Sequence, residues 1–329
     1  MSDLEKILLI KGKKFLFKVE TSSRSSDYAK YEELRDEIWG FPEDNLPGTR
    51  NMMCENFLHE GSSLFIAVYQ EEARGGFREE GESLVGFSYG FVGVKDKAVA
   101  FKSLDNLWFY SQYTGVKTGF QGRGLGILIK EFQRDILQDT FGIHMVTCTY
   151  DPLTGVNAHR NVHRFGMEVL EYRAATYGEY GGLLNRADVP TDRFFMSWNL
   201  KKPAGRRSRR PEARLEDSRL VVRTGYSNVQ GKTRPIELEV AKGIDLELRS
   251  DLLFVQIPLN FYIMLRETDV SDPGVRRIPL DWRMRTRQAF KSLLAKGYQV
   301  IDFRKTTGPT PGNFYILQRA APPYKGVRR

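Results

Sequence analysis

A glycine-dense stretch near the middle of the chain, residues 116–127, constrains the fold more than any other feature. It reads Val-Lys-Thr-Gly-Phe-Gln-Gly-Arg-Gly-Leu-Gly-Ile, and it lies between an aromatic-rich segment and one with apolar residues at helical spacing. Glycines allow a backbone to approach a ligand closely, and the first turn of a helix has unpaired N–H groups and a partial positive charge. The stretch therefore predicts a strand-to-helix joint that can bind phosphate groups.

Two familiar nucleotide-binding motifs do not fit this joint. A Walker loop requires a Lys-Ser or Lys-Thr pair after its last glycine, and none occurs between Gly119 and Gly126. A dinucleotide fingerprint requires two residues between its second and third glycines, whereas a single residue separates Gly124 from Gly126. We therefore do not expect a nucleotide site of either kind.

The spacing of apolar residues and chain breakers predicts a mixed α/β layout. Up to residue 200 we expect strands at 15–19, 63–69, 83–91, 106–116, 144–150, 168–172 and 193–200. Helices are expected in that part at about 25–39, 49–59, 124–139 and 157–165. Farther on, strands are expected at 235–240, 252–258, 298–304 and 313–318, with helices near 260–268 and 281–296.

One pattern occurs twice in the chain. Residues 164–172 and 295–303 share a helix end, a glycine, and then apolar, polar, Val, aliphatic, acidic and aromatic positions. Helix–Gly–strand joints are common, so chance similarity explains the echo as well as duplication of half a fold does.

Charge is distributed unevenly along the chain, although the net charge is only +9. Residues 1–200 contain 23 Lys and Arg against 28 Asp and Glu, whereas residues 201–329 contain 27 against 13. The stretch 201–211 has six basic residues and no acid, which predicts an exposed linker or, alternatively, a polyanion-binding segment. We therefore expect a first domain at 1–200, a basic linker at 201–234 and an α/β extension at 235–329.

Cysteine content and hydropathy restrict the cellular setting. The two cysteines, Cys54 and Cys148, cannot form a disulfide framework, and neither has a CxxC partner for zinc. The N-terminal apolar run covers only Ile7–Ile10, and no apolar stretch reaches the roughly 18 residues that a membrane-spanning helix requires. These patterns predict a cytoplasmic protein without a membrane partner.

The glycine loop resembles one phosphate-binding motif closely. Gln121-x-x-Gly124-x-Gly126, entered through residues 116–120, is similar to the acyl-CoA pyrophosphate loop of the GNAT superfamily of N-acyltransferases. Residues 151–158 and 161–167 are similar to the family's next segment, and the resemblance covers about residues 13–200. It implies a GNAT fold, in which helices flank a central, mixed, twisted sheet. The whole chain also looks like a branch of predicted acetyltransferases with a smaller C-terminal α/β extension.

The resemblance implies a donor site where two parallel strands diverge, here 106–116 and 144–150. The residues that it assigns to acyl-CoA are Val116, Gln121, Gly122, Arg123, Gly124, Leu125, Gly126 and Asn157. The donor is expected to be acetyl-CoA or another acyl-CoA such as succinyl-CoA, because surplus Arg in the C-terminal part can bind a carboxylate. The acceptor is expected to be a small-molecule amine, such as an amino acid or a derivative, and the protein a monomer or a homodimer without a metal.

The family's catalytic residues are not matched in this sequence. The family has a tyrosine acid four residues before the glycine that ends the short helix, and counting back from Gly166 leads to Val162. The strand before the loop has Ser-Gln-Tyr at 111–113 where a glutamate base is usual. The remaining candidates for an acid or a base are His163, Tyr150, Tyr177, Asp151 and Glu179.

Other interpretations stay open at this point. The missing tyrosine and glutamate are also typical of an acyl-CoA-binding protein that has lost catalysis. A nucleic-acid-associated acyltransferase would use the positive C-terminal part, but no aromatic platform interleaves with its basic residues, so a nucleic-acid partner is not expected. His159 and His163 have i, i+4 spacing, which suits a metal, but no third ligand occurs at motif spacing.

Overall fold

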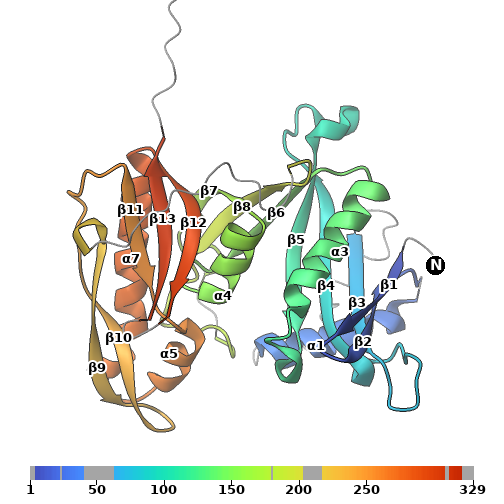
Figure 1. Ribbon diagram of the computed structural model, residues 1–329, viewed down its shortest axis with the longest axis horizontal. Helices are drawn as coiled ribbons and strands as arrows, with labels where there is room; N and C mark the ends of the chain where they lie inside the picture. Colours follow the sequence, from blue (N-terminus) through green and yellow to red (C-terminus); the bar gives the residue numbers. More distant parts are fainter. Residues whose placement is uncertain are drawn as a thin grey trace, which may run out of the picture. The chain divides into compact units, whose positions relative to one another are not determined.

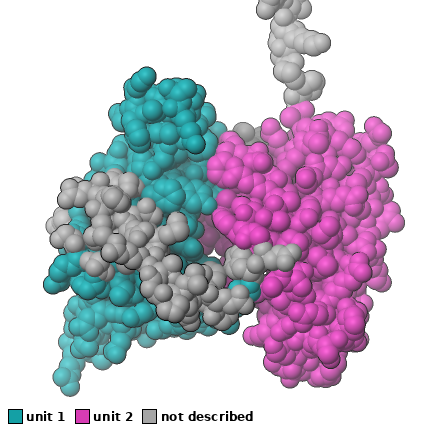
Figure 2. Space-filling model, turned by 180° about the vertical axis from the view of Figure 1, so that it is seen from behind, with its two compact units in different colours: residues 1–148, 181–183, 198–202 teal, residues 149–180, 184–197, 203–329 magenta. Residues whose placement is uncertain are grey.

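The computed structural model describes residues 4–22, 24–40, 63–178, 181–202, 217–307 and 311–320. It confirms the mixed α/β class (Figure 1). Two compact units are formed (Figure 2), the first from residues 1–148, 181–183 and 198–202, and the second from 149–180, 184–197 and 203–329. Among the described helices, none is long and apolar enough to cross a bilayer.

The first unit is built on a sheet with the strand order β1-β2-β3-β4-β5-β6. The strands are β1 (Glu5–Ile10), β2 (Lys13–Val19), β3 (Ser63–Gln70), β4 (Leu84–Val94), β5 (Leu107–Val116) and β6 (Met145–Tyr150). Neighbours are antiparallel except β5 and β6, which run parallel. The sequence does not predict strand β1, because its apolar run is short and two of its apolar residues are exposed. The helix expected at 49–59 lies outside the described residues.

Two helices cover opposite faces of this sheet, α1 (Ala29–Trp39) and α3 (Leu125–Asp139). A Cβ atom on Gly115 of β5 would meet side chains of α1, whereas one on Gly86 of β4 would meet Ile129 of α3. The apolar spacing of α3 predicts one buried face, and the structure confirms it: Leu128 is half-buried, and four other apolar residues are buried, namely Leu125, Ile129, Phe132 and Ile136. The 3-10 helices are η1 (Ser25–Tyr28), η2 (Gly81–Ser83), η3 (Ala100–Lys102), η4 (Leu104–Asn106), η5 (Thr118–Phe120) and, in the second unit, η7 (Asp217–Arg219).

The second unit contains the end of β6 and most of the remaining elements. Its helices are α4 (Gly155–Ala158), which continues as the π-helix η6 (His159–Arg164), and α5 (Phe261–Glu267), α6 (Pro273–Arg276) and α7 (Ile278–Ala295). Its strands are β7 (Glu168–Arg173), β8 (Arg193–Asn199), β9 (Val222–Gln230), β10 (Pro235–Ile244), β11 (Leu252–Ile257), β12 (Tyr298–Thr306) and β13 (Gly312–Arg319). An aromatic cluster forms its centre, in which the ring centroids of Phe194 and Phe290 lie 4.8 Å apart and those of Phe290 and Tyr315 lie 5.2 Å apart.

Two expectations about domain boundaries need correction. Residues 222–230 of the supposed linker 201–234 form β9, which pairs with β10 in an antiparallel hairpin. The division at residue 200 also differs from the structure, because residues 149–180 and 184–197 belong to the same compact unit as the C-terminal part. The physical reason is that Phe194 and its neighbours pack on α7 and β13.

The chain path that follows β6 occurs a second time. After β6 come helical turns, then β7 and β8, and β8 lies between β6 and β7 in the order β6-β8-β7. After β11 come helices, then β12 and β13, and β13 lies between β11 and β12 in the order β11-β13-β12. The echo at 164–172 and 295–303 falls on β7 and β12, at equivalent places of this path, and half-fold duplication stays a prediction.

Candidate functional site

The glycine loop forms a sharp joint between β5 and α3. The N–H of Lys117 still donates to the carbonyl of Val85, 2.9 Å away, and the chain then makes the turn η5. Gly122 and Gly124 have φ angles of +73° and +85°, a left-handed conformation that favours glycine. Gly124 is the N-cap of α3, and the side chain of Leu125 is buried beneath the helix start.

The loop offers a row of donors beside open space. Within the described residues, the backbone N–H groups from Gly122 to Gly126 donate to no acceptor. A Cβ atom added at Gly119, Gly122 or Gly124 would meet no atom within 4 Å. Successive unpaired N–H groups at the start of a 15-residue helix can bind an anion, because the helix dipole adds to their partial charges.

Side chains hold this loop in shape and add positive charge. The amide of Gln121 donates to the carbonyl of Val116 over 3.1 Å, so the loop closes back on the end of β5. The guanidinium of Arg123 donates to the carbonyl of Gly119 at 3.4 Å and lies over the ring of Phe120. The structure thus places the predicted residues 116 and 121–126 together in one joint.

Lys11 is a member of this site that sequence reasoning missed. Its ammonium donates to the carbonyl of Gly122, 3.3 Å away, although 111 positions separate the two residues. It lies in the turn between β1 and β2, and no local pattern connects that turn to the loop. Lys11 and Arg123 give the loop two cations, which suits a ligand with several phosphate charges.

The strands β5 and β6 diverge beside the loop. Within the described part of the chain, two residue pairs join them in the ladder, Phe109 with Val146 and Tyr110 with Thr147. On its other edge β5 remains paired with β4 as far as Val116, but its register shifts so that Gln112 is an extra residue. A bulge of this kind bends a strand and ends pairing on one side. Beyond Tyr110, the β6-facing edge of β5 is therefore outside the ladder, as the diverging strands of the predicted site require.

A series of hydrogen bonds between buried polar side chains connects the bulged strand β5 to α3. The ammonium of Lys130, which is 3% exposed, donates to the hydroxyl of Ser111. It also donates to the amide oxygen of Gln133 at 3.2 Å, and that amide donates to the hydroxyl of Ser88 on β4 at 2.7 Å. Hydrogen bonds of this kind fix the position of β5 next to the loop, because each partner is buried and would be costly to leave unpaired.

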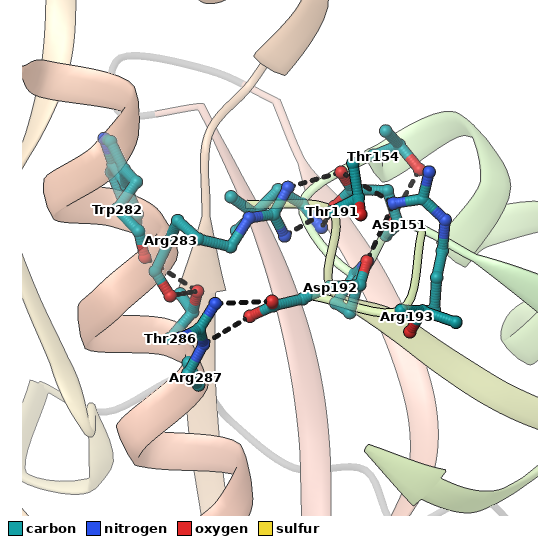
Figure 3. A network of polar contacts seen from close by, with 12 residues as sticks. Asp151, Thr154, Thr191, Asp192, Arg193, Trp282, Arg283, Thr286 and Arg287 are labelled. Carbon is teal, nitrogen blue, oxygen red and sulfur yellow. Dashed lines mark hydrogen bonds and ion pairs between the residues drawn. The ribbon is translucent and has the colours of Figure 1, made fainter. Parts of the chain in front are cut away.

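The candidate acid and base residues lie in the second unit, as does Asn157. Asp151 follows β6 directly, and both of its carboxylate oxygens accept from Arg283, a fully buried residue of α7 (Figure 3). It also accepts from the N–H of Leu153 at 2.9 Å and lies 3.6 Å from Arg193. Since these contacts use the oxygens that a base needs, Asp151 is a structural anchor and its assignment as a base is not supported.

A second ion pair lies beside the first in Figure 3. Asp192, fully buried, accepts from Arg287 at 2.8 and 2.6 Å and from the hydroxyl of Tyr172 at 2.6 Å. Burial opposes ionisation of Asp192, but the hydrogen bonds from Arg287 and Tyr172 outweigh it and hold its pKa below the usual value. Burial raises the pKa of Tyr172 far above its usual value, and the charge of Asp192 adds to the effect. Arg283 and Arg287, one turn apart on α7, thus fix the end of β6 and the start of β8.

The two tyrosine candidates differ in accessibility. Tyr150 is 5% exposed, and its hydroxyl lies 3.0 Å from that of Tyr315, which donates to the carbonyl of Pro152. This core position does not support Tyr150 as an acid. Tyr177 is 48% exposed, its hydroxyl lies 2.8 Å from that of Thr149, and Arg193 lies over its ring.

Asn157 and the two neighbouring histidines, His159 and His163, have partners within their own short helix. Asn157 donates to the hydroxyl of Thr154 at 3.0 Å and accepts from Arg160 at 2.9 Å, and its cofactor role stays a prediction. Glu179 lies outside the described residues, whereas Cys148 is buried in the core. The rings of His159 and His163 stack with centroids 4.8 Å apart, and the described residues contain no group of three His, Cys, Asp or Glu able to hold a metal.

Comparison with known proteins finds similarity to solved structures but no match in sequence. No family model matches the sequence, and no curated protein matches it. The chain is similar to the ribosomal-protein-S18-alanine N-acetyltransferase of Escherichia coli, with 12% identity, a TM-score of 0.38, and coverage of 59% of this chain and 99% of that one. It is also similar to NAA60 of Arabidopsis thaliana in complex with acetyl-CoA, with 11% identity, a TM-score of 0.39, and coverage of 56% and 99%.

A third similar structure is the spermidine/spermine N-acetyltransferase SpeG of Vibrio cholerae, with 11% identity, a TM-score of 0.37, and coverage of 56% and 96%. At these TM-scores the likeness is remote, so the loop and the diverging strands of this chain carry the functional assignment.

Proposed function

We propose that this protein is an acyl-CoA-dependent N-acyltransferase of the GNAT type. The observation that carries the proposal is the row of unpaired N–H groups from Gly122 to Gly126, which opens onto free space at the start of α3. This arrangement suits a pyrophosphate, because each N–H can donate to a phosphate oxygen and the helix dipole favours the negative charge. Lys11 and Arg123 add charge of the right sign.

The diverging strand supplies the second requirement of the reaction. Beyond Tyr110, the edge of β5 that faces away from β4 has backbone groups outside the sheet ladder, and they run toward the loop. Such an edge can pair with the amides of an extended pantetheine arm, as an added strand would. An N–H on it can donate to the thioester carbonyl and stabilise the oxyanion that forms when an amine attacks.

The finer assignment concerns donor and acceptor. We propose acetyl-CoA as donor and a small amine, such as an amino acid or its derivative, as acceptor. Transfer occurs by direct attack in a ternary complex, so no covalent enzyme intermediate is required. Succinyl-CoA remains a donor to be tested, since the C-terminal part is rich in Arg.

A calorimetric titration of the full chain with acetyl-CoA, succinyl-CoA and free CoA tests the proposal. The wild-type protein is expected to bind at least one of the thioesters, and Gly124→Trp, checked by circular dichroism for its fold, is expected to lose binding. The preferred thioester is then incubated with amines while CoA thiol release is measured. A folded wild-type chain that binds no CoA compound contradicts the proposal, and binding without turnover of any amine favours an acyl-CoA-binding protein.

A further inference from the structure

The first unit's sheet has an open edge along strand β1 (Figure 1). β1 is the end strand in the order β1-β2-β3-β4-β5-β6, and no strand of the described chain pairs with its outer edge. The carbonyl of Leu4 accepts from the N–H of Val19, 2.8 Å away, and the direction of backbone groups alternates along an antiparallel strand. The even-numbered residues of β1 therefore direct their N–H and C=O groups to β2, and those of Glu5, Ile7 and Leu9 point outward.

The side chains in the middle of this edge are apolar and exposed. Leu9 is 72% exposed and Ile7 is 44% exposed, and both lie on the same face of the sheet because they are two positions apart. Natural proteins usually protect an open strand edge with a charged residue, a proline or a bulge. Residues 7–10 contain neither a charge nor a proline, and the register between β1 and β2 is continuous. This edge is therefore typical of a strand that pairs with another chain.

We propose that β1 is a dimerisation edge, on which β1 of a second copy of this chain pairs in the antiparallel direction. The inference goes beyond the proposed function and does not depend on it. Antiparallel pairing places the start of one strand beside the end of the other, so Glu5 of each copy lies near the other copy's turn, which contains Lys11 and is followed by Lys13. Opposite charges thus meet at both ends of the pair, whereas parallel pairing would place like charges together.

The exposed side chains determine the register of this pair. Outward-pointing backbone groups must meet each other, so odd-numbered residues pair with odd-numbered ones. With Leu8 opposite the partner's Leu8, Ile7 lies opposite the partner's Leu9, and Leu9 lies opposite the partner's Ile7. Each of these two pairs exchanges two backbone hydrogen bonds, and both bury side chains that are exposed in the single chain. In either neighbouring register, a charged residue, Glu5 or Lys11, would lie opposite one of the apolar ones.

Sedimentation velocity of the full chain over a roughly hundredfold range of concentration tests the pairing. The wild-type chain is expected to dimerise reversibly, since an edge of six residues is a small interface. Leu9→Lys is expected to weaken the dimer at least about tenfold, because a twofold contact contains the substitution twice and a charge blocks a strand edge. The matched control is Leu104→Lys, the same change at a 75% exposed residue between β4 and β5, which is expected to leave the dimer intact. In dilute solution both variants are expected to melt like the wild-type chain, because both side chains are exposed.

Disulfide formation tests the register. Opposite residues that exchange no hydrogen bonds in an antiparallel pair have Cα atoms about 4.5 Å apart, within reach of a disulfide. Leu8→Cys is therefore expected to form a covalent dimer under mild oxidation. Lys6→Cys, on the same face and more exposed, is expected to form none, because it lies opposite the partner's Ile10. The wild-type chain, which has two cysteines of its own, is oxidised in parallel as the blank.

Three results would overturn the inference. The first is a wild-type chain that stays monomeric at every concentration. The second is a dimer that Leu9→Lys weakens no more than Leu104→Lys does, and the third is equal crosslinking of Leu8→Cys and Lys6→Cys. Each of them leaves the proposed function as it stands, because acetyl-CoA binding is measured separately.

Discussion

The proposed phosphate-binding role of the loop can be separated from its structural role by comparing substitutions of two glycines. Gly124 and Gly142 lie at opposite ends of α3, have φ angles of +85° and +64°, and would both place a Cβ atom in open space. Replacing either by Ala forces a left-handed conformation on a residue with a Cβ, which costs about 1–2 kcal/mol. Both variants are therefore expected to lose a similar amount of stability.

The two variants are expected to differ in binding. A methyl group on Gly124 enters open space at the start of α3, within the row of unpaired N–H groups to which the proposal assigns the phosphate oxygens. Losing one hydrogen bond to a charged group costs about 1.5–3 kcal/mol, so Gly124→Ala is expected to bind acetyl-CoA about 10–150 times more weakly. Gly142→Ala, remote from those donors along the helix, is expected to bind like the wild-type protein.

Two measurements decide between these expectations. Thermal melting without ligand is expected to show similar decreases for both variants, about 2–8 °C for the strain given above. Calorimetric titration with acetyl-CoA then compares their affinities. Equal affinities of Gly124→Ala and Gly142→Ala would show that the open space at Gly124 is not the phosphate site, and the proposal would lose the observation that carries it.

Substitutions at three charged residues, Lys11, Asp192 and Glu239, test further parts of the structure. Lys11→Gln is expected to weaken acetyl-CoA binding about 3–10-fold, and Lys13→Gln, on the neighbouring strand, to leave it unchanged, as measured by calorimetry. Asp192→Asn is expected to cost about 3–5 kcal/mol in urea unfolding because it leaves Arg287 without its buried partner, whereas Asp188→Asn, in an exposed pair, is expected to cost under about 1. Because the pKa of Asp192 is lowered, its stabilisation is present above the usual carboxyl pKa and is lost as pH falls through the lowered value. Burial raises the pKa of Glu239, so wild-type stability is expected to fall as pH rises from the usual value through the raised one, and Glu239→Gln is expected to flatten that dependence.

The conformation of the glycine joint was predictable because its determinants are local. Strand, glycine turn and amphipathic helix follow one another within residues 107–139, and the structure confirms each of them. Backbone conformation at Gly122 and Gly124 depends on the residues themselves, so sequence pattern suffices there.

The remaining contacts depend on residues that are remote in the sequence. Lys11 reaches Gly122 across 111 positions, Arg283 reaches Asp151 across 132, and His163 reaches Asp302 across 139. Strand β9 was missed for another reason, because most of its residues are polar and its apolar residues do not alternate with them as in a typical half-buried strand. Pairing with β10, not its own pattern, makes this segment a strand.

The resemblance to a single transferase domain ends near residue 200, but the structure predicts that a chain cut after Lys202 does not fold. Tyr150, Tyr172 and Phe194 are each at most 7% exposed, and they pack among aromatic side chains of α7 and β13. Exposing three such side chains costs about 5–9 kcal/mol, which is comparable to the whole stability of a domain. Asp151 and Asp192 would lose Arg283 and Arg287 at the same time. Circular dichroism and proteolysis of the truncated chain check this, and a cooperative melt of that fragment would contradict it. The C-terminal extension therefore stabilises the end of β6 and the start of β8. It belongs to the same compact unit as residues 149–180 and 184–197, and for this reason Asp302 of β12 can lie beside His163.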